Sequence, residues 1–333
     1  MLAKQHAVIV GDYLSGGGFG WAYWPKHHAK LALIGTNENG SKRQFLKGFS
    51  SILSTKCEVS VHWITGEDSV VMDEAIAYDS IPWVEGFSDP PEFFEDRHTF
   101  MDIRSFFTSS YVRLLAMKRG INRADLPHLV YREHMEGPLA GFRRAVNQNG
   151  IAWLEEELKE LDEVHWHREG DIRKFHVARN LSIVDSAISF LKAVWSVWAY
   201  IAQLKEPERL LIIAEPPKEL LSETTNVEIR DIVVKTLSIL SYLADETTTT
   251  FVLSSEMFYP VPELPFRHVV ILPTSDSDIN LMEKSNRDNV QAPLLFAEWE
   301  RGNHGVCLWE DRYTGERHII QLRADGHELV ELT

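Results

Sequence analysis

The stretch of residues 31–43, LALIGTNENGSKR, restricts what this chain can fold into more than any other part of the sequence. An apolar run ends at Gly35, four residues follow, and Gly40 precedes a segment whose apolar residues recur at helical spacing. A strand, a glycine loop and a helix in this order match the frame of the phosphate-binding motif G-x-x-x-x-G-K-S/T, in which backbone N–H groups and the helix N-terminus hold phosphate. The motif predicts a continuous set of contact residues: Gly35, Thr36, Asn37, Glu38, Asn39, Gly40, Ser41, Lys42 and Arg43.

The last two positions of this motif are exchanged. The motif has lysine and then serine or threonine, whereas this chain has Ser41 and then Lys42. In a working loop the lysine contacts the β- and γ-phosphates and the hydroxyl binds Mg²⁺. Because successive helix residues project about 100° apart, we expect Lys42 to point away from the direction of the motif lysine, and its charge at a metal-ligand position to repel Mg²⁺. An ordinary strand, turn and helix with two glycines is the alternative interpretation.

Two further strand ends carry polar residues. Residues 210–215, LLIIAE, are typical of a buried parallel strand that ends in a carboxylate. A nucleotide hydrolase has Asp-Glu there, but this chain has Ala214 and keeps Glu215, the candidate catalytic residue. The strand predicted over residues 248–253 is followed by Ser255, a candidate for contact with a γ-phosphate. Each strand end alone also fits a capped, buried strand. Together, the displaced hydroxyl and the missing aspartate predict a site that no longer uses the metal.

The order of these segments resembles the FtsK–HerA class of RecA-like ring ATPases, which includes the conjugation and type IV secretion ATPases. The resemblance covers most of the chain and rests on residues 11–13 and 23–25 ahead of the loop, on the loop itself, on the strand ending in Glu215, and on residues 269–278. It implies an α/β fold with a RecA-like, mostly parallel β-sheet flanked by helices. It also implies a single domain over residues 1–333, a helical insert at 97–180, and a C-terminal β-hairpin tail at 294–333.

The same resemblance implies a function. The protein would be a degenerate P-loop ATPase that binds ATP or ADP weakly or not at all, has lost its Mg²⁺ groups, and serves as a non-hydrolysing subunit of a DNA-translocation, conjugation or secretion-type assembly. Members of this class form rings and use an arginine from a neighbouring subunit, for which Arg230, Arg267 and Arg287 are candidates. Two alternatives stay open: an active ATPase, in which Lys42 reaches back to the phosphates and Glu215 supports hydrolysis, and a structural protein without nucleotide.

Composition limits the partners and the compartment. The formal net charge is -15, and such a surface does not attract nucleic acid or an anionic membrane by itself. Contact with nucleic acid is therefore expected only through an assembly. Two cysteines, Cys57 and Cys307, do not make a disulfide framework, and no apolar run is long enough to cross a bilayer. We expect a cytoplasmic protein without membrane insertion.

Histidines suggest one more alternative, a metal hydrolase. The chain has 14 histidines, including His128 and His134 on either side of Glu133, and three more at positions 165, 167 and 176. None of these groups has the spacing of a zinc-peptidase helix. We therefore predict no metal site and regard the histidines as scattered surface or core residues.

Overall fold

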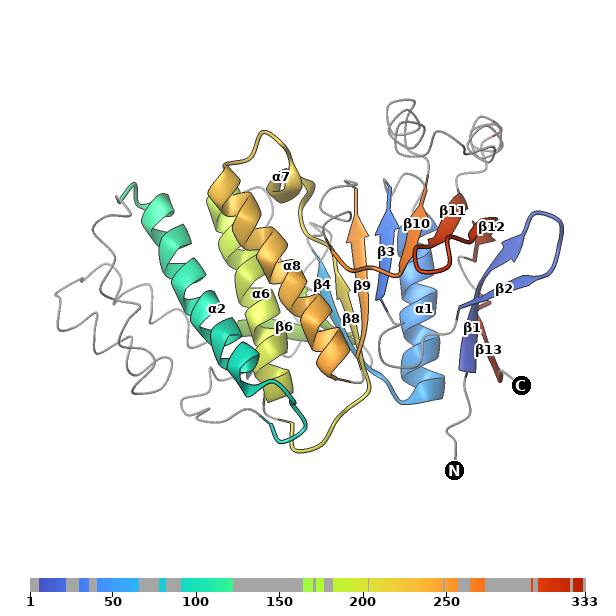
Figure 1. Cartoon of the computed structure of the whole chain (residues 1–333), viewed down its shortest axis with the longest axis horizontal. Helices are drawn as coiled ribbons and strands as arrows, with labels where there is room; N and C mark the ends of the chain where they lie inside the picture. The colour runs from blue at the N-terminus through green and yellow to red at the C-terminus, as the bar shows by residue number, and fades with distance from the viewer. Residues whose placement is uncertain are drawn as a thin grey trace. The chain divides into compact units, whose positions relative to one another are not determined.

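The computed structural model describes the chain in segments that form two compact units (Figure 1). The first unit comprises Met1–Val61, Arg209–Lys218 and Thr248–Thr333, and the second comprises His62–Glu208 and Glu219–Thr247. The described residues are 6–21, 30–35, 41–65, 78–81, 91–121, 164–169, 172–176, 182–202, 204–247, 249–256, 264–272, 301, 305–323 and 326–331.

Four parallel strands form the core of the first unit. They are β3 (Lys30–Ile34), β8 (Leu210–Ala214), β9 (Thr249–Ser255) and β10 (His268–Ile271), in the spatial order β10-β3-β9-β8. Every residue of β3, β8 and β9 is buried, as their continuous apolar runs predict for strands covered on both faces. Because the strands are parallel, their carboxyl ends meet at one edge, which we call the carboxyl edge.

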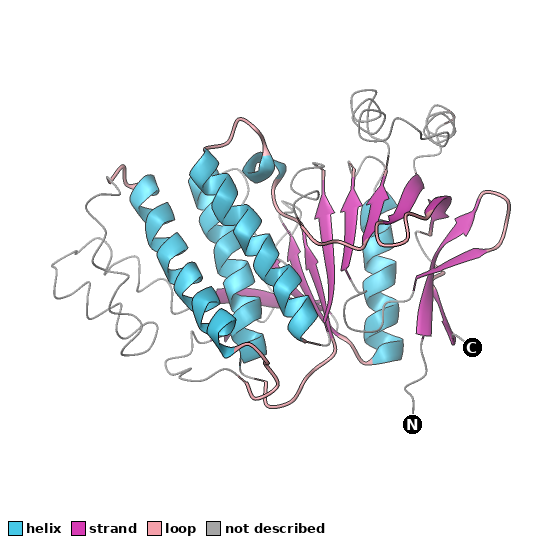
Figure 2. Ribbon diagram, in the orientation of Figure 1, coloured by secondary structure: helices cyan, strands magenta, loops and turns pink. Residues whose placement is uncertain are grey.

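Antiparallel strands extend this core on the β10 side. They are β1 (His6–Tyr13), β2 (Gly18–Trp21), β11 (Val306–Asp311), β12 (Arg317–Leu322) and β13 (Glu328–Glu331), in the order β13-β1-β12-β11-β10 with β2 beside β1. The predicted α/β fold and its parallel core are confirmed, but the sheet is mixed instead of mostly parallel (Figure 2). The short connections β1–β2 and β11–β12 can only join antiparallel neighbours.

The helix after the glycine loop is α1 (Ser41–Cys57). Its apolar side chains Phe45, Leu46, Phe49 and Leu53 are fully buried, and the Phe49 ring lies 5.3 Å from that of Trp21 on β2. The next strand, β4 (Ser60–Thr65), begins in the first unit, where the Ser60 N–H donates to the Arg209 carbonyl at 3.0 Å. The loop strand β3 pairs with β9 and β10, both far from it in sequence.

The C-terminal hairpin prediction is confirmed by β11 and β12, which pair in antiparallel register from Val306↔Gln321 to Glu310↔Arg317. Gly315 in its turn has a φ of 75°, a backbone conformation that favours glycine. The Asp311 carboxylate accepts hydrogen bonds from the backbone N–H groups of Tyr313 and Thr314 at 2.8 and 3.2 Å. Side-chain acceptors of this kind are why aspartate is frequent in turns.

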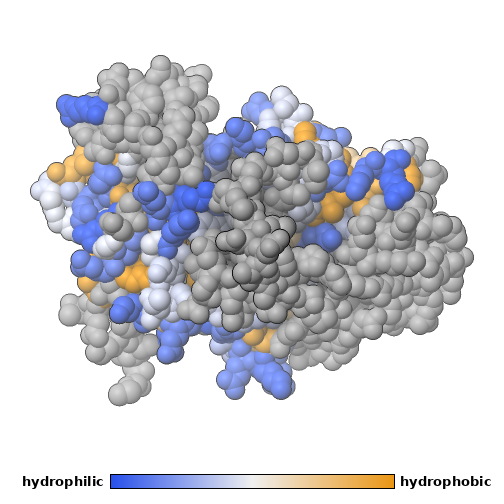
Figure 3. All heavy atoms as spheres, turned by 180° about the vertical axis from the view of Figure 1, so that it is seen from behind, coloured by the Kyte–Doolittle hydropathy of each residue, from blue (hydrophilic) through white to orange (hydrophobic). Residues whose placement is uncertain are grey.

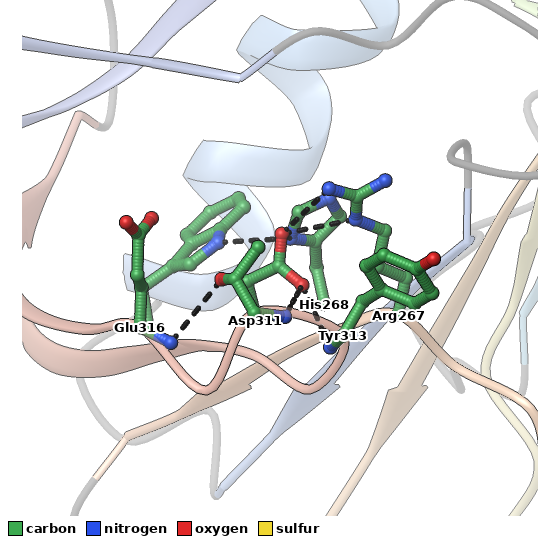
Figure 4. A network of polar contacts seen from close by, with 7 residues as sticks. Arg267, His268, Asp311, Tyr313 and Glu316 are labelled. Atoms are coloured by element: carbon green, nitrogen blue, oxygen red, sulfur yellow. Dashed lines mark hydrogen bonds and ion pairs between the residues drawn. The ribbon is translucent and has the colours of Figure 1, made fainter.

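Figure 4 shows how the hairpin is attached to β10. The Arg267 guanidinium donates to Asp311 at 2.9 Å, and the Trp309 indole N–H donates to Nδ1 of His268 at 3.4 Å. Burial lowers the pKa of His268 to about 4; Asp311 opposes this shift and Arg267 adds to it. Burial raises the pKa of Asp311, but hydrogen bonds from Arg267 and the turn outweigh it and hold the pKa below its usual value. The network therefore combines a neutral imidazole with an ionised pair.

The second unit contains a layer of three long helices, α2 (Arg97–Lys118), α6 (Ile183–Ala202) and α8 (Val227–Glu246), which lie side by side in Figure 1. Stacked aromatic rings join them, with Phe107 of α2 5.6 Å from Trp195 of α6. The unit also has three antiparallel strands, β5 (Tyr78–Ile81), β6 (Val164–Glu169) and β7 (Ile172–His176). A short helix, α7 (Lys218–Leu221), lies at the boundary between the units.

The predicted helical insert at 97–180 contains α2 and the hairpin of β6 and β7, and its residues 122–163 lie outside the described part. The single-domain prediction and the bounds of the insert stay predictions. Among the described helices, none combines the length and the apolar character that a membrane crossing needs. The described part of the surface in Figure 3 is mainly hydrophilic, with small separate hydrophobic patches.

We predict that His268→Gln makes stability less sensitive to acid. The folded-state pKa of about 4 lies below the ordinary value of about 6.5, so the unfolded chain binds more protons between these values. The contribution of His268 is complete above pH 6.5 and is lost as the pH falls toward 4. Wild-type protein should lose about 1–2 kcal/mol of unfolding free energy through this group between pH 7 and 5, and the variant should not. Urea unfolding at both pH values measures the difference, and an equal loss in the two proteins would contradict the assignment.

Candidate functional site

The loop strand ends within a network of main-chain hydrogen bonds at the carboxyl edge. The Gly35 N–H donates to the Ser255 carbonyl at 2.9 Å, and the Leu272 N–H donates to the Ile34 carbonyl at 2.8 Å. The segments of β9 and β10 on either side of β3 therefore fix the end of β3 by hydrogen bonds. Gly35 has a φ of 134°, a conformation open essentially to glycine alone. The first glycine of the motif is thus required by the backbone itself.

Several predicted contact residues cannot be placed. Thr36, Asn37, Glu38, Asn39 and Gly40 lie outside the described residues. Ser41 is the first residue of α1, as the motif predicts for its position. Arg43 is half-buried in the first turn of the same helix. The roles of these residues in binding stay predictions.

Lys42 is turned toward the base of the loop. Its side chain is buried, with 4% of the residue exposed, and Nζ donates to the carbonyls of Gly35 at 2.7 Å and Ser255 at 3.4 Å. That Lys42 departs from the direction of the motif lysine stays a prediction, but its ammonium lies against the first glycine of the loop. Helical Cα–Cβ bonds tilt toward the helix N-terminus, and four methylene groups give the ammonium enough reach to return to the strand end. A buried positive charge therefore lies where β3 and β9 end.

The carboxylate of Glu215 lies at the end of β8, two strands away from β3. Its Oε1 accepts a hydrogen bond from the Ser254 hydroxyl at 3.0 Å, which follows from the parallel register that places Ala214 beside Leu253. With strands about 4.8 Å apart, Glu215 and Gly35 are separated by roughly two strand spacings.

Ser254 is the residue that sequence reasoning missed. The prediction selected Ser255, which is also buried and contributes its carbonyl to Gly35 and Lys42. Side chains alternate along a strand, so neighbouring serines have different surroundings, and only the pairing of β8 with β9 shows which one contacts the carboxylate. Beyond them, Lys218 and Glu256 form an ion pair at 3.5 Å between the segments that follow β8 and β9.

The arginine candidates lie in different surroundings. Arg267 is paired with Asp311 at the start of β10, at the edge of the sheet opposite the carboxyl edge. Arg230 belongs to α8 of the second unit, and Arg287 lies outside the described residues. Arg267 is thus already engaged within its own subunit.

The histidine alternative has no geometric support within the described segments. No cluster of three or more His, Cys, Asp or Glu side chains able to hold a metal ion occurs among these residues. His165 and His167 lie on β6 and His176 on β7. His128 and His134 lie outside the described part of the chain.

No protein-family model matches the sequence, and no curated protein sequence matches it. Two solved structures share a distant similarity of fold. The pCW3 conjugation coupling protein TcpA, in its monomer form with ATPgS, has a TM-score of 0.42 and 10% sequence identity over 98% of this chain and 68% of TcpA. The cytoplasmic domain of the Thermomonospora curvata type VII secretion ATPase EccC has a TM-score of 0.40 and 10% identity over 94% of this chain, which spans 28% of that structure.

We predict that Lys42→Met destabilises the first unit more than the same substitution at an exposed lysine of α1. Methionine fills similar space but leaves the carbonyls of Gly35 and Ser255 without the ammonium. The expected loss is about 1–3 kcal/mol of unfolding free energy, the usual range for a buried hydrogen bond to a charged group. The control, Lys47→Met, lies on the exposed side of the same helix and should change stability by less than about 0.5 kcal/mol. Equal effects in urea unfolding would show that the Lys42 contacts contribute nothing.

Proposed function

We propose that this protein is a nucleotide-binding, non-hydrolysing subunit of an assembly that translocates DNA or protein, of the conjugation or secretion type. The observation that carries the proposal is the Lys42 ammonium at the base of the glycine loop, bonded to Gly35 and Ser255. A fixed cation next to the N-terminus of α1 makes an environment that favours an anion, because the unpaired N–H groups of a helix start add to the positive field.

The ligand we propose is ATP or ADP, bound weakly. A complete loop has a lysine at the first helical position after the second glycine, and this chain has Ser41 there. Lys42 supplies one positive charge, and part of its hydrogen-bonding capacity is already used by two carbonyls. Fewer charge-assisted contacts to the phosphates mean lower affinity than a complete motif provides.

We propose that the protein does not hydrolyse ATP because groups needed for hydrolysis are missing from β8 or engaged elsewhere. Ala214 has no side-chain oxygen that could order a metal ion. Arg267 is paired with Asp311 of the same chain. The competing function is an active ATPase, which the Glu215–Ser254 contact favours because it positions a carboxylate at the carboxyl edge. Metal-dependent ATP turnover that disappears in Glu215→Gln would establish that competitor and refute the proposal.

The proposed role in an assembly concerns protein partners first. A net charge of -15 gives the isolated subunit no electrostatic attraction to nucleic acid. We therefore propose a homo- or hetero-oligomeric ring or complex whose other surfaces contact the translocated molecule. Sedimentation with and without nucleotide tests this part of the proposal, since the assembly should form or change with the ligand.

We predict that Gly35→Ala abolishes measurable ATP and ADP binding in isothermal titration calorimetry. A Cβ at a φ of 134° costs roughly 1–3 kcal/mol, and relief of this strain would move the start of the loop. Gly16→Ala is the matched control, because Gly16 also has a positive φ of 92° but lies in the β1–β2 turn with no atom near the added Cβ. The control should bind nucleotide like the wild type. Binding that survives in Gly35→Ala, or no binding by the wild type, would refute a nucleotide site at this loop.

A further inference from the structure

At the positions where the motif holds Mg²⁺, the described residues of this chain do not fit the ion. Magnesium needs oxygen ligands at short distance in nearly octahedral geometry. At the position where the motif has a hydroxyl, this chain has Lys42, and at the position of the ordering carboxylate it has Ala214, whose methyl group is fully buried. The carboxylate that follows β8, Glu215, accepts a hydrogen bond from Ser254. The two groups that would bind the ion are thus replaced by an ammonium and a methyl group.

Lys42 is held in place by two main-chain carbonyls. Its ammonium bonds to the carbonyl of Gly35, which starts the loop, and to that of Ser255, which ends the adjacent strand. Carbonyl oxygens are also good ligands for small cations, so the ammonium uses contacts that could otherwise attract one. Because the group is almost fully buried, its charge is poorly screened and repels a second cation nearby.

We propose that the Lys42 ammonium takes the place of the divalent metal, so that the site binds a metal-free nucleoside di- or triphosphate and excludes the magnesium complex. This inference rests on the proposed nucleotide site. The ammonium supplies a positive charge beside the phosphates without a metal, while a Mg²⁺ ion carried by the nucleotide would approach that ammonium. Magnesium and the protein therefore compete for the same phosphate oxygens.

The consequence is that Mg²⁺ should change the nucleotide affinity in the direction opposite to that of a complete loop. In a complete loop Mg²⁺ and nucleotide bind cooperatively, whereas here Mg²⁺ should weaken the apparent affinity for ATP and ADP. Linkage makes the effect reciprocal, and couplings between two ligands are typically about 5–150-fold. We expect this chain to bind ATP and ADP at least about fivefold more tightly in EDTA than in excess Mg²⁺.

The test is isothermal titration calorimetry of the full chain with ATP and ADP, in EDTA and in excess Mg²⁺, at constant ionic strength. The decisive variant exchanges the two side chains, Ser41→Lys with Lys42→Ser, which restores the order of the complete motif. Its affinity should increase when Mg²⁺ is added, opposite in sign to the wild type. Lys47→Ser controls for loss of a lysine from α1 and should keep the wild-type metal effect. Far-UV circular dichroism and thermal unfolding verify that the variants fold.

The outcomes separate this inference from the proposed function. Wild-type affinity that is equal or higher in Mg²⁺ overturns the inference but leaves a nucleotide site in place. No heat of binding under either condition, in wild type and exchange variant alike, refutes the nucleotide site and the inference with it. Tighter binding in EDTA by the wild type supports the inference even if the exchange variant fails to fold.

Discussion

The Lys42 ammonium joins three segments of the first unit: the first turn of α1, the end of β3 just before it in the sequence, and the distant end of β9. Its hydrogen bonds to Gly35 and Ser255 are made inside the protein, where a charged donor without partners would be costly. The main-chain bond from Gly35 to Ser255 closes the same connection. Gly35 and Lys42, on either side of the loop, are therefore bonded to each other and to the end of β9.

The parallel core makes this arrangement possible. β3 lies between β9 and β10, and β8 follows on the far side of β9, so the strand bearing Ser254 and Ser255 separates the loop from Glu215. One serine contributes its carbonyl toward the loop and the other its hydroxyl toward the carboxylate. The opposite edge of the sheet is built differently, with Arg267 and Asp311 fastening the C-terminal hairpin to β10. The candidate site thus lies at the carboxyl ends of the parallel strands, and the ion pair that attaches the hairpin lies at their amino ends.

Much of the first unit could be predicted because its signals are local. Apolar runs predicted β3, β8 and β9, and helical spacing predicted α1. What failed depends on contacts between distant segments. The strand beside β3 could not be chosen from sequence order, nor could the pairing of β1 with β12 and β13. The contacts of Lys42 with the Gly35 and Ser255 carbonyls were not foreseen, because projection angles along the helix do not include the reach of a lysine side chain. Ser254 was missed because the alternation of a buried strand does not indicate which face meets Glu215.

The most direct measurement of the central claim is anomalous diffraction from crystals grown with ADP and Mn²⁺, a visible substitute for Mg²⁺. We predict density for the nucleotide phosphates at the loop between Gly35 and α1, with the Lys42 ammonium still bonded to the Gly35 carbonyl and no manganese peak beside it. A manganese peak bridging the phosphates and the N-terminus of α1, with Lys42 displaced from Gly35 and Ser255, would contradict the account.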